Sequence, residues 1–189
     1  MKNFRLMLTL LLLIMTFSCG KNKDAKTFYK RGIANLDLKK SDMAIEDFNK
    51  AIAINPNDAE IYGSRGVAYY NKGQYDRAIE DFNKAITINP NYAKAYYNRG
   101  DAYALKGQLD TAIEDFNKAI AINSNDSRAY YNRGVAYYNK KQYDMAIENF
   151  NKAIAINPNF TRAYYNRGLA YYNKGMKYNP KISPAVIKK

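Results

Sequence analysis

The sequence predicts an all-α fold, a solenoid of stacked helical hairpins with four full repeats and a terminal half repeat. The first observation is a period of 34 residues, as in "DFNKAI" at 47–52, 81–86 and 115–120 and "NFNKAI" at 149–154. The second is that each period holds two helical stretches of about 13 residues, separated by turn signals such as "NKGQY" at 71–75. A single hairpin cannot bury its apolar face alone, but stacked hairpins can.

The first 18 residues are predicted to be a signal peptide, which takes no part in the fold. A short basic start, "MKNFR", precedes the apolar run "LMLTLLLLIMTF" at 6–17. As a helix this run spans about 18 Å, well short of the roughly 30 Å core of a bilayer. A charged start, a short apolar run and small residues at the junction are typical of a secretory signal.

Cys19 is the predicted lipidation site. The stretch "MTFSCG" resembles the lipobox of bacterial lipoproteins, in which a small residue precedes a cysteine that receives lipid and becomes the new N-terminus. Ser18 fits this pattern, whereas Thr16 departs from the leucine that is usual there. The resemblance implies export and lipid anchoring to a bacterial cell-envelope membrane, inner or outer, through a lipidated tether at 19–24. Plain cleavage with secretion and a retained anchor are the alternatives.

The second repeat shows the expected local structure. A helix is predicted at 60–72, and Gly73 suits the left-handed residue that follows a helix end. A second helix is predicted at 76–88, with Asp76 as its cap and an end before Asn89-Pro90. Two helices joined by a tight turn make a helical hairpin.

The predicted repeats are 25–58, 59–92, 93–126 and 127–160. A fifth repeat keeps only its first helix, within 161–175, and a basic tail follows at 176–189. This half repeat either caps the stack or offers a contact for self-association.

The pattern within each period resembles the tetratricopeptide repeat. The family places an aromatic residue, a glycine, a tyrosine, an alanine, an aromatic residue, an alanine and a proline at fixed positions. In the second repeat these are Tyr62, Gly66, Tyr69, Ala78, Phe82, Ala85 and Pro90. The resemblance covers 25–175 and implies a right-handed superhelix whose first helices line a concave groove, where partner segments usually bind.

Two recurring residues of the first helices are predicted to serve packing. A glycine costs about 1 kcal/mol inside a helix, so its repetition indicates a close approach by the second helix. These glycines are Gly32, Gly66, Gly100, Gly134 and Gly168. An arginine precedes each of them, and the expected ion-pair partners are the carboxylates Glu46-Asp47, Glu80-Asp81 and Glu114-Asp115 of the second helices.

The candidate binding residues form a groove lined by tyrosine and asparagine on the outer side of the first helices. In "AYYNRG" at 95–100 the second tyrosine lies about 100° around the helix from the first, which faces the core. Tyrosine offers a large contact area with a polar tip, and asparagine both donates and accepts hydrogen bonds. The groove residues are Tyr70, Tyr97, Asn98, Tyr131, Asn132, Val135, Tyr138, Tyr165, Asn166, Leu169 and Tyr172, with the edge cations Lys94, Arg128 and Arg162. The alternative is that these tyrosines only cover duplicated helices and bind nothing.

Composition narrows the function. The chain has no histidine and a single cysteine, so we expect no enzyme, no metal site and no cofactor. Of the net charge of +13, residues 25–175 hold 22 basic and 16 acidic residues, or +6. This mixed surface does not favour nucleic acid. We therefore expect a membrane-tethered, exported scaffold that binds an unidentified protein or peptide segment. The alternative is a module that binds a cell-envelope polymer, peptidoglycan or sugar.

Overall fold

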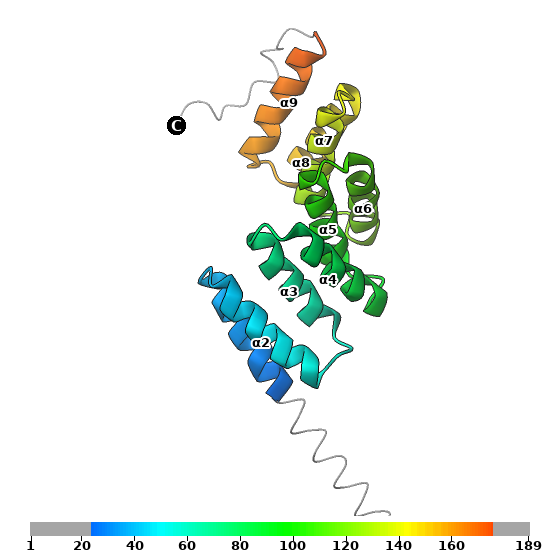
Figure 1. Ribbon diagram of the computed structural model, residues 1–189. Helices are drawn as coiled ribbons and strands as arrows, with labels where there is room; N and C mark the ends of the chain where they lie inside the picture. The colour runs from blue at the N-terminus through cyan, green and yellow to red at the C-terminus, as the bar shows by residue number, and fades with distance from the viewer. Residues whose placement is uncertain (1–23, 176–189) are drawn as a thin grey trace, which may run out of the picture. The chain divides into compact units, whose positions relative to one another are not determined.

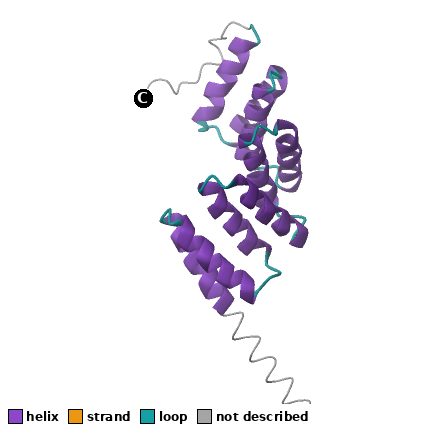
Figure 2. Cartoon of the chain, in the orientation of Figure 1, coloured by secondary structure: helices purple, strands orange, loops and turns teal. Residues whose placement is uncertain are grey.

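The computed structural model describes residues 24–175, and every regular element in that range is a helix (Figures 1 and 2). A helix covers residues 24–37. It is followed by α2 (Ser41–Ile54), α3 (Ala59–Asn71), α4 (Tyr75–Ile88), α5 (Ala93–Leu105), α6 (Leu109–Ile122), α7 (Ser127–Asn139), α8 (Tyr143–Ile156) and α9 (Thr161–Asn173). The all-α prediction is confirmed. Within this range no helix combines the length and apolar character needed to cross a membrane.

The predicted signal peptide at 1–18, Cys19 and the basic tail at 176–189 lie outside the described residues. The chain divides into two compact units at Pro90–Asn91. We call the helix at 24–37, α3, α5, α7 and α9 the first helices of the repeats, and α2, α4, α6 and α8 the second helices. Within the units, α3 packs on α4, α5 on α6 and α7 on α8, and α9 packs against α8.

The turn inside each described hairpin contains a residue in the left-handed region. Gly73 has φ = +72°, as the sequence predicts, because glycine has no Cβ to clash there. The prediction that Asp76 caps the next helix is wrong. The helix α4 begins one residue earlier, at Tyr75, with Gln74 at the N-cap and Asp76 in the first turn. A carboxylate in that turn is favoured by the helix dipole without acting as a cap.

Each hairpin closes around one phenylalanine of its second helix. Phe48, Phe82, Phe116 and Phe150 are the largest fully buried side chains of the described residues. In the first unit, Phe48 packs with alanines of α2 and with Ile61 and Ala68 of the next hairpin. Each such ring contributes about 2–3 kcal/mol of burial free energy, so these rings hold the hairpins together.

The repeated glycines lie opposite these rings, which confirms their predicted packing role in four repeats. A Cβ atom on Gly66 would lie 2.6 Å from Cε1 of Phe82, and one on Gly100 would lie 3.0 Å from Cε1 of Phe116. Gly168 differs from the other four, because a Cβ there meets nothing within 4 Å.

The repeated arginines bind the second helices, as predicted, in three repeats. The Nε atom of Arg65 donates to Asp81, and that of Arg99 donates to Asp115, each over 2.8 Å. Arg31 pairs with Asp47 in the same way. All three carboxylates are buried, so each pair is shielded from solvent on its carboxylate side, unlike an ion pair that is fully exposed.

In the fourth repeat the arginine finds an amide in place of a carboxylate. Asn149 occupies the position of the aspartates, and its Oδ1 atom accepts from Nε of Arg133 at 2.7 Å. The Nη1 atom of Arg133 reaches back to Oδ1 of Asn117 in α6 at 2.5 Å. Arg133 therefore joins its own hairpin to the preceding one through neutral acceptors.

Ion pairs at the helix ends also join consecutive hairpins. Lys140, at the end of α7, pairs with Asp110 in the first turn of α6. Lys174 pairs with Asp144 in the same relation between α9 and α8. The aspartates are exposed, so each pair contributes under about 1 kcal/mol and mainly fixes the register of the stack.

Candidate functional site

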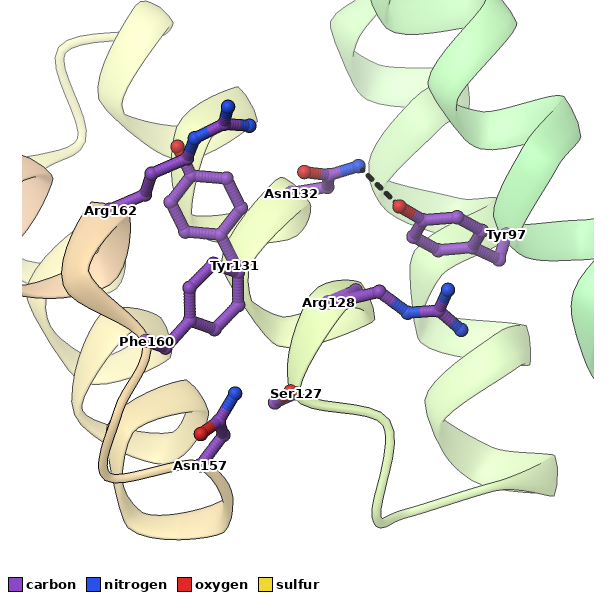
Figure 3. A pocket seen from close by; sticks show the side chains of 8 residues that line it. All are labelled: Tyr97, Ser127, Arg128, Tyr131, Asn132, Asn157, Phe160 and Arg162. Carbon is purple, nitrogen blue, oxygen red and sulfur yellow. Dashed lines mark hydrogen bonds between the residues drawn. The ribbon is translucent and has the colours of Figure 1, made fainter.

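A cavity of about 420 Å³ opens in the second unit, between α5, α7 and the start of α9 (Figure 3). The first helices α5 and α7 contribute most of its lining, and the link from α8 into α9 closes one side. Its lining residues are Tyr97, Ser127, Arg128, Tyr131, Asn132, Asn157, Phe160 and Arg162. The surface is thus made of aromatic rings, amides and two guanidinium groups.

Tyr97 forms the α5 side of the cavity. Its hydroxyl oxygen accepts a hydrogen bond from Nδ2 of Asn132 at 3.1 Å, and the same amide group donates to Oδ1 of Asp101 at 3.0 Å. Burial, with a smaller contribution from the Asp101 carboxylate, raises the pKa of Tyr97 to about 12. The hydroxyl therefore stays protonated and neutral at physiological pH.

Tyr131 lies under the link between α8 and α9. Its ring centroid is 4.8 Å from that of Phe160 and 5.8 Å from that of Phe150. Figure 3 shows the Tyr131 and Phe160 rings together on one wall of the cavity, with Arg162 above Tyr131. Burial raises the pKa of Tyr131 above its ordinary value. The tyrosine is therefore held on two sides and presents only part of its ring to the cavity.

The two arginines of the cavity differ in their partners. Nη2 of Arg128 pairs with Oδ2 of Asp126 at 3.0 Å, and its guanidinium lies 5.3 Å from the centre of the Tyr97 ring. Arg162 is exposed and makes no ion pair within residues 24–175. Arg162 is therefore the cation of this site that remains available to an acidic group.

A ladder of tyrosine and asparagine runs along the first helices of the second unit. Besides the Asn132–Tyr97 bond, Asn166 donates to the Tyr131 hydroxyl at 2.7 Å and Asn173 donates to the Tyr138 hydroxyl at 2.8 Å. Each bond joins residues 35 apart in the sequence. The Nδ2 groups of these asparagines thus donate hydrogen bonds to the preceding repeat. This gives the asparagines a structural role that the sequence does not reveal.

The structure brings five of the predicted groove residues to the cavity, and they are Tyr97, Tyr131, Asn132, Arg128 and Arg162. Nine do not line it: Tyr70, Lys94, Asn98, Val135, Tyr138, Tyr165, Asn166, Leu169 and Tyr172. Of these, Tyr70 belongs to the first unit. Tyr165 and Tyr172 on α9 are exposed to 68% and 78%.

Sequence reasoning missed the residues that complete the cavity. Phe160, Asn157 and Ser127 line it, and Asp101 lies behind Asn132. At two positions the residue differs from its counterparts in the other repeats, and these differences could have indicated the cavity. Phe160 stands where Asp126 caps α7 in the preceding repeat, and Asp101 is the charged member of an otherwise apolar row with Val135 and Leu169. Both residues that differ from their repeat counterparts thus take part in the cavity, Phe160 in its lining and Asp101 as an acceptor for Asn132.

No cluster of histidine, cysteine, aspartate and glutamate within residues 24–175 has a geometry that would hold a metal ion. Nor do the residues of the cavity include a histidine, a cysteine or a carboxylate. Their chemistry suits contact with a partner through hydrogen bonds, ring faces and positive charge.

Comparison with known families identifies the repeat. Residues 36–73, 68–107 and 100–141 match the family described as TPR repeat. Residues 127–160 and 149–184 match families described as tetratricopeptide repeat. The chain belongs to the tetratricopeptide repeat family. Together with the helical hairpins, this confirms the predicted fold class.

Solved structures agree with this assignment. A crystal structure of the MamA protein is 32% identical over 82% of this chain and 84% of its own, with a TM-score of 0.74. MamA 41-end from Desulfovibrio magneticus RS-1 is 26% identical over 80% and 86%, with a TM-score of 0.74. YrrB, described as a TPR protein with an unusual peptide-binding site, is 23% identical over 91% and 93%, with a TM-score of 0.71. No curated protein sequence matches the chain.

Proposed function

We propose that this tetratricopeptide repeat protein is an exported, lipid-anchored scaffold that binds an acidic segment of a partner protein in the cavity between α5, α7 and α9. The proposal rests on the position and the free charge of Arg162. It lies at the rim of a cavity that has no carboxylate in its lining, and it has no ion pair within the described residues. A charge-assisted hydrogen bond from a guanidinium to a carboxylate is about twice as strong as a neutral one.

The rest of the lining suits a peptide segment. The rings of Tyr97, Tyr131 and Phe160 offer flat apolar surface beside the cation. Because Asn132 and Phe160 already hold two of these rings in place, little conformational entropy is lost when a partner binds. Aromatic and arginine side chains of this kind carry much of the binding energy in protein interfaces.

YrrB, whose structure is described as having an unusual peptide-binding site, has the same fold. At 23% identity that likeness shows the fold alone. The proposed binding therefore rests on the cavity of this chain. The repeat scaffold itself serves many partners, so fold alone would not single out a peptide.

The anchoring part of the proposal rests on the lipobox-like stretch that ends at Cys19. A lipid on Cys19 and a short polar tether would leave the repeats at the membrane surface. More than one acyl chain is needed for stable anchoring, which the lipoprotein type of modification supplies.

Selection of peptides from a displayed random library on the purified chain tests the binding proposal. We expect the selected peptides to be rich in aspartate and glutamate, and their affinity to fall as the salt concentration rises. Arg162→Glu should weaken the best peptide at least tenfold, because it turns an attraction into a repulsion. Circular dichroism should show unchanged helicity, since Arg162 is exposed.

Lys94→Glu is the matched control. Lys94 is the second residue of α5 as Arg162 is the second residue of α9, it carries the same charge, and it does not line the cavity. We expect this variant to bind within about twofold of the wild type. Selection of peptides without acidic residues would overturn the proposal, and so would equal losses in the two variants. Binding to purified peptidoglycan sacculi that Arg162→Glu leaves unchanged would favour the polymer-binding alternative.

A further inference from the structure

In the part of the chain that the structure describes, α9 is the last helix, and one of its faces is covered by no other described helix. In each earlier repeat of the described part, the first helix packs against a second helix of its own hairpin, whereas α9 packs only on the preceding hairpin. In each of the four earlier repeats, the second helix of the hairpin covers this face of the first helix. They therefore serve as internal templates for the missing contact.

Gly168 marks the centre of the uncovered face. In the four preceding first helices the equivalent glycine faces a phenylalanine ring, at 2.8 Å from Cβ to Cε1 for Gly134 and Phe150. At Gly168 no atom lies within 4 Å of the same Cβ position. The position is thus open in the described residues, whereas the four earlier repeats place an aromatic ring there.

Two tyrosines of α9 lack the ring contacts of their counterparts. Tyr131 lies 5.8 Å from the Phe150 ring, and Tyr138 lies 5.6 Å from the Tyr143 ring of the same hairpin. Their equivalents on α9, Tyr165 and Tyr172, are exposed to 68% and 78%. Two largely exposed aromatic rings on one helix are typical of a surface that another element covers.

Arg167 adds charge to the same face. In three earlier repeats the equivalent arginine places Nε and Nη2 on an aspartate that directly precedes the buried phenylalanine, as Arg99 does with Asp115. Arg167 keeps the bond from Nη1 to the preceding hairpin, to Oδ1 of Asn151 at 2.6 Å. Within residues 24–175 it has no carboxylate partner, so the face favours an occupant with an acidic side chain beside its ring.

We propose that the open face of α9 docks a helix of another protein that carries the pattern Tyr-x-x-Ala-x-x-Asp-Phe-x-x-Ala. The helix α4 shows this pattern at Tyr75, Ala78, Asp81, Phe82 and Ala85. The phenylalanine fills the space at Gly168, the tyrosine covers Tyr172, and the aspartate pairs with Arg167. This surface uses residues that do not line the cavity, so it stands apart from the function proposed above.

Two other occupants fit the chemistry less well. The tail at 176–189 contains Pro180 and Pro184 and no phenylalanine, so its sequence lacks the pattern. A second copy of the chain does contain the pattern, but its phenylalanines are fully buried in their own hairpins. An exchange of helices would have to open one of those hairpins first.

A labelled peptide with the sequence of α4, residues 75–88, is a direct probe. We expect it to bind the purified chain in fluorescence anisotropy, and the same peptide with Phe82→Ala to bind at least tenfold more weakly. Gly168→Leu in the chain should abolish binding, since the leucine fills the space that the ring needs. That variant should stay folded because the position is open. Lys152→Leu, which adds a leucine at an exposed site of α8, should bind as the wild type does.

A double-mutant cycle tests the charge. Arg167→Gln should weaken the α4 peptide several-fold, but it should have little effect on the peptide that already carries Asp81→Asn. Failure of the α4 peptide to bind would overturn the proposal, as would equal binding by the Phe82→Ala peptide. If the chain alone self-associates in sedimentation, and Gly168→Leu abolishes that association, the occupant is a second copy and the proposal is wrong.

Discussion

Gly134 lies so close to Phe150 that a Cβ atom on the glycine would come within 2.8 Å of the ring atom Cε1. The same sequence position one repeat later, Gly168, has no neighbour within 4 Å. Two glycines with the same local sequence thus have opposite surroundings, because a second helix follows only one of them in the described residues.

This contrast predicts opposite effects of one substitution. Gly134→Ala should lower the free energy of unfolding by about 1–3 kcal/mol, since the methyl group must displace the Phe150 ring. Gly168→Ala should raise it by about 0.5–1 kcal/mol, because alanine is the better helix former and meets no obstacle. Urea unfolding followed by circular dichroism measures both. Destabilisation by Gly168→Ala would show that the α9 face is covered in the chain itself.

The pair of Arg99 and Asp115 predicts a graded response. Asp115→Ala leaves a largely buried guanidinium without its carboxylate and should cost about 2–3 kcal/mol. Asp115→Asn should cost only about 1 kcal/mol, because Arg133 and Asn149 show that an amide accepts the same Nε–H bond at 2.7 Å. Thermal and urea unfolding of both variants decide this. Equal losses would mean that the charge of the aspartate, and not its acceptor geometry, stabilises the hairpin.

Asp47 predicts part of the acid sensitivity of the fold. The hydrogen bond from Arg31 holds the pKa of Asp47 below its ordinary value, which is about 4. The folded state then binds the proton less readily than the unfolded state. The contribution of Asp47 to stability is therefore complete above about pH 4 and is lost as the pH falls through the lowered folded pKa.

The measurement is the free energy of unfolding of the wild type and of Asp47→Asn across pH. We expect the advantage of the wild type to be constant at about pH 5–7 and to shrink below about pH 4. Asp37→Asn, at an exposed carboxylate of the same unit, is the control, and we expect its free energy of unfolding at about pH 5–7 to lie closer to that of the wild type than that of Asp47→Asn does. An advantage that persists unchanged into strong acid would contradict the role of the Arg31–Asp47 pair.

Tyr131 is expected to separate stability from binding. Tyr131→Ala removes a ring that contacts Phe150 and Phe160, so it should cost about 3 kcal/mol or more as well as lose binding. Tyr131→Phe keeps both ring contacts and removes only the hydroxyl that accepts from Asn166, at a cost of about 1 kcal/mol. Peptide binding by the folded Tyr131→Phe variant should stay within a few-fold of the wild type. A complete loss there would assign the hydroxyl itself to the partner.

Cys19 predicts the anchoring. In bacteria that express the chain, Cys19→Ala should abolish the incorporation of a labelled fatty acid and release the repeats from the membrane fraction. Helicity should be unaffected, since Cys19 lies before the first described hairpin. Membrane retention by the unlabelled Cys19→Ala variant would instead favour an anchor that is retained without lipid.

The sequence by itself determined the helical hairpin, the lengths of its two helices and the faces on which they pack. A 34-residue period, a glycine in every first helix and an aromatic residue in every second helix are local features, and they specify helix lengths and the faces that pack. The pairing of Arg65 with Asp81 also follows from the repeat, because both positions recur with it. Repetition turns a local pattern into a packing rule.

Only the tertiary structure decided which outer tyrosines are covered. Tyr131 and Tyr165 have the same local sequence, yet Tyr131 lies beneath Phe160 and accepts from Asn166, while Tyr165 is largely exposed. Their difference comes from residues one repeat away, which no local pattern contains. Burial depends on which residues from other repeats lie nearby in space. For that reason the cavity at Arg162 and the open face at Gly168 follow only from the tertiary structure.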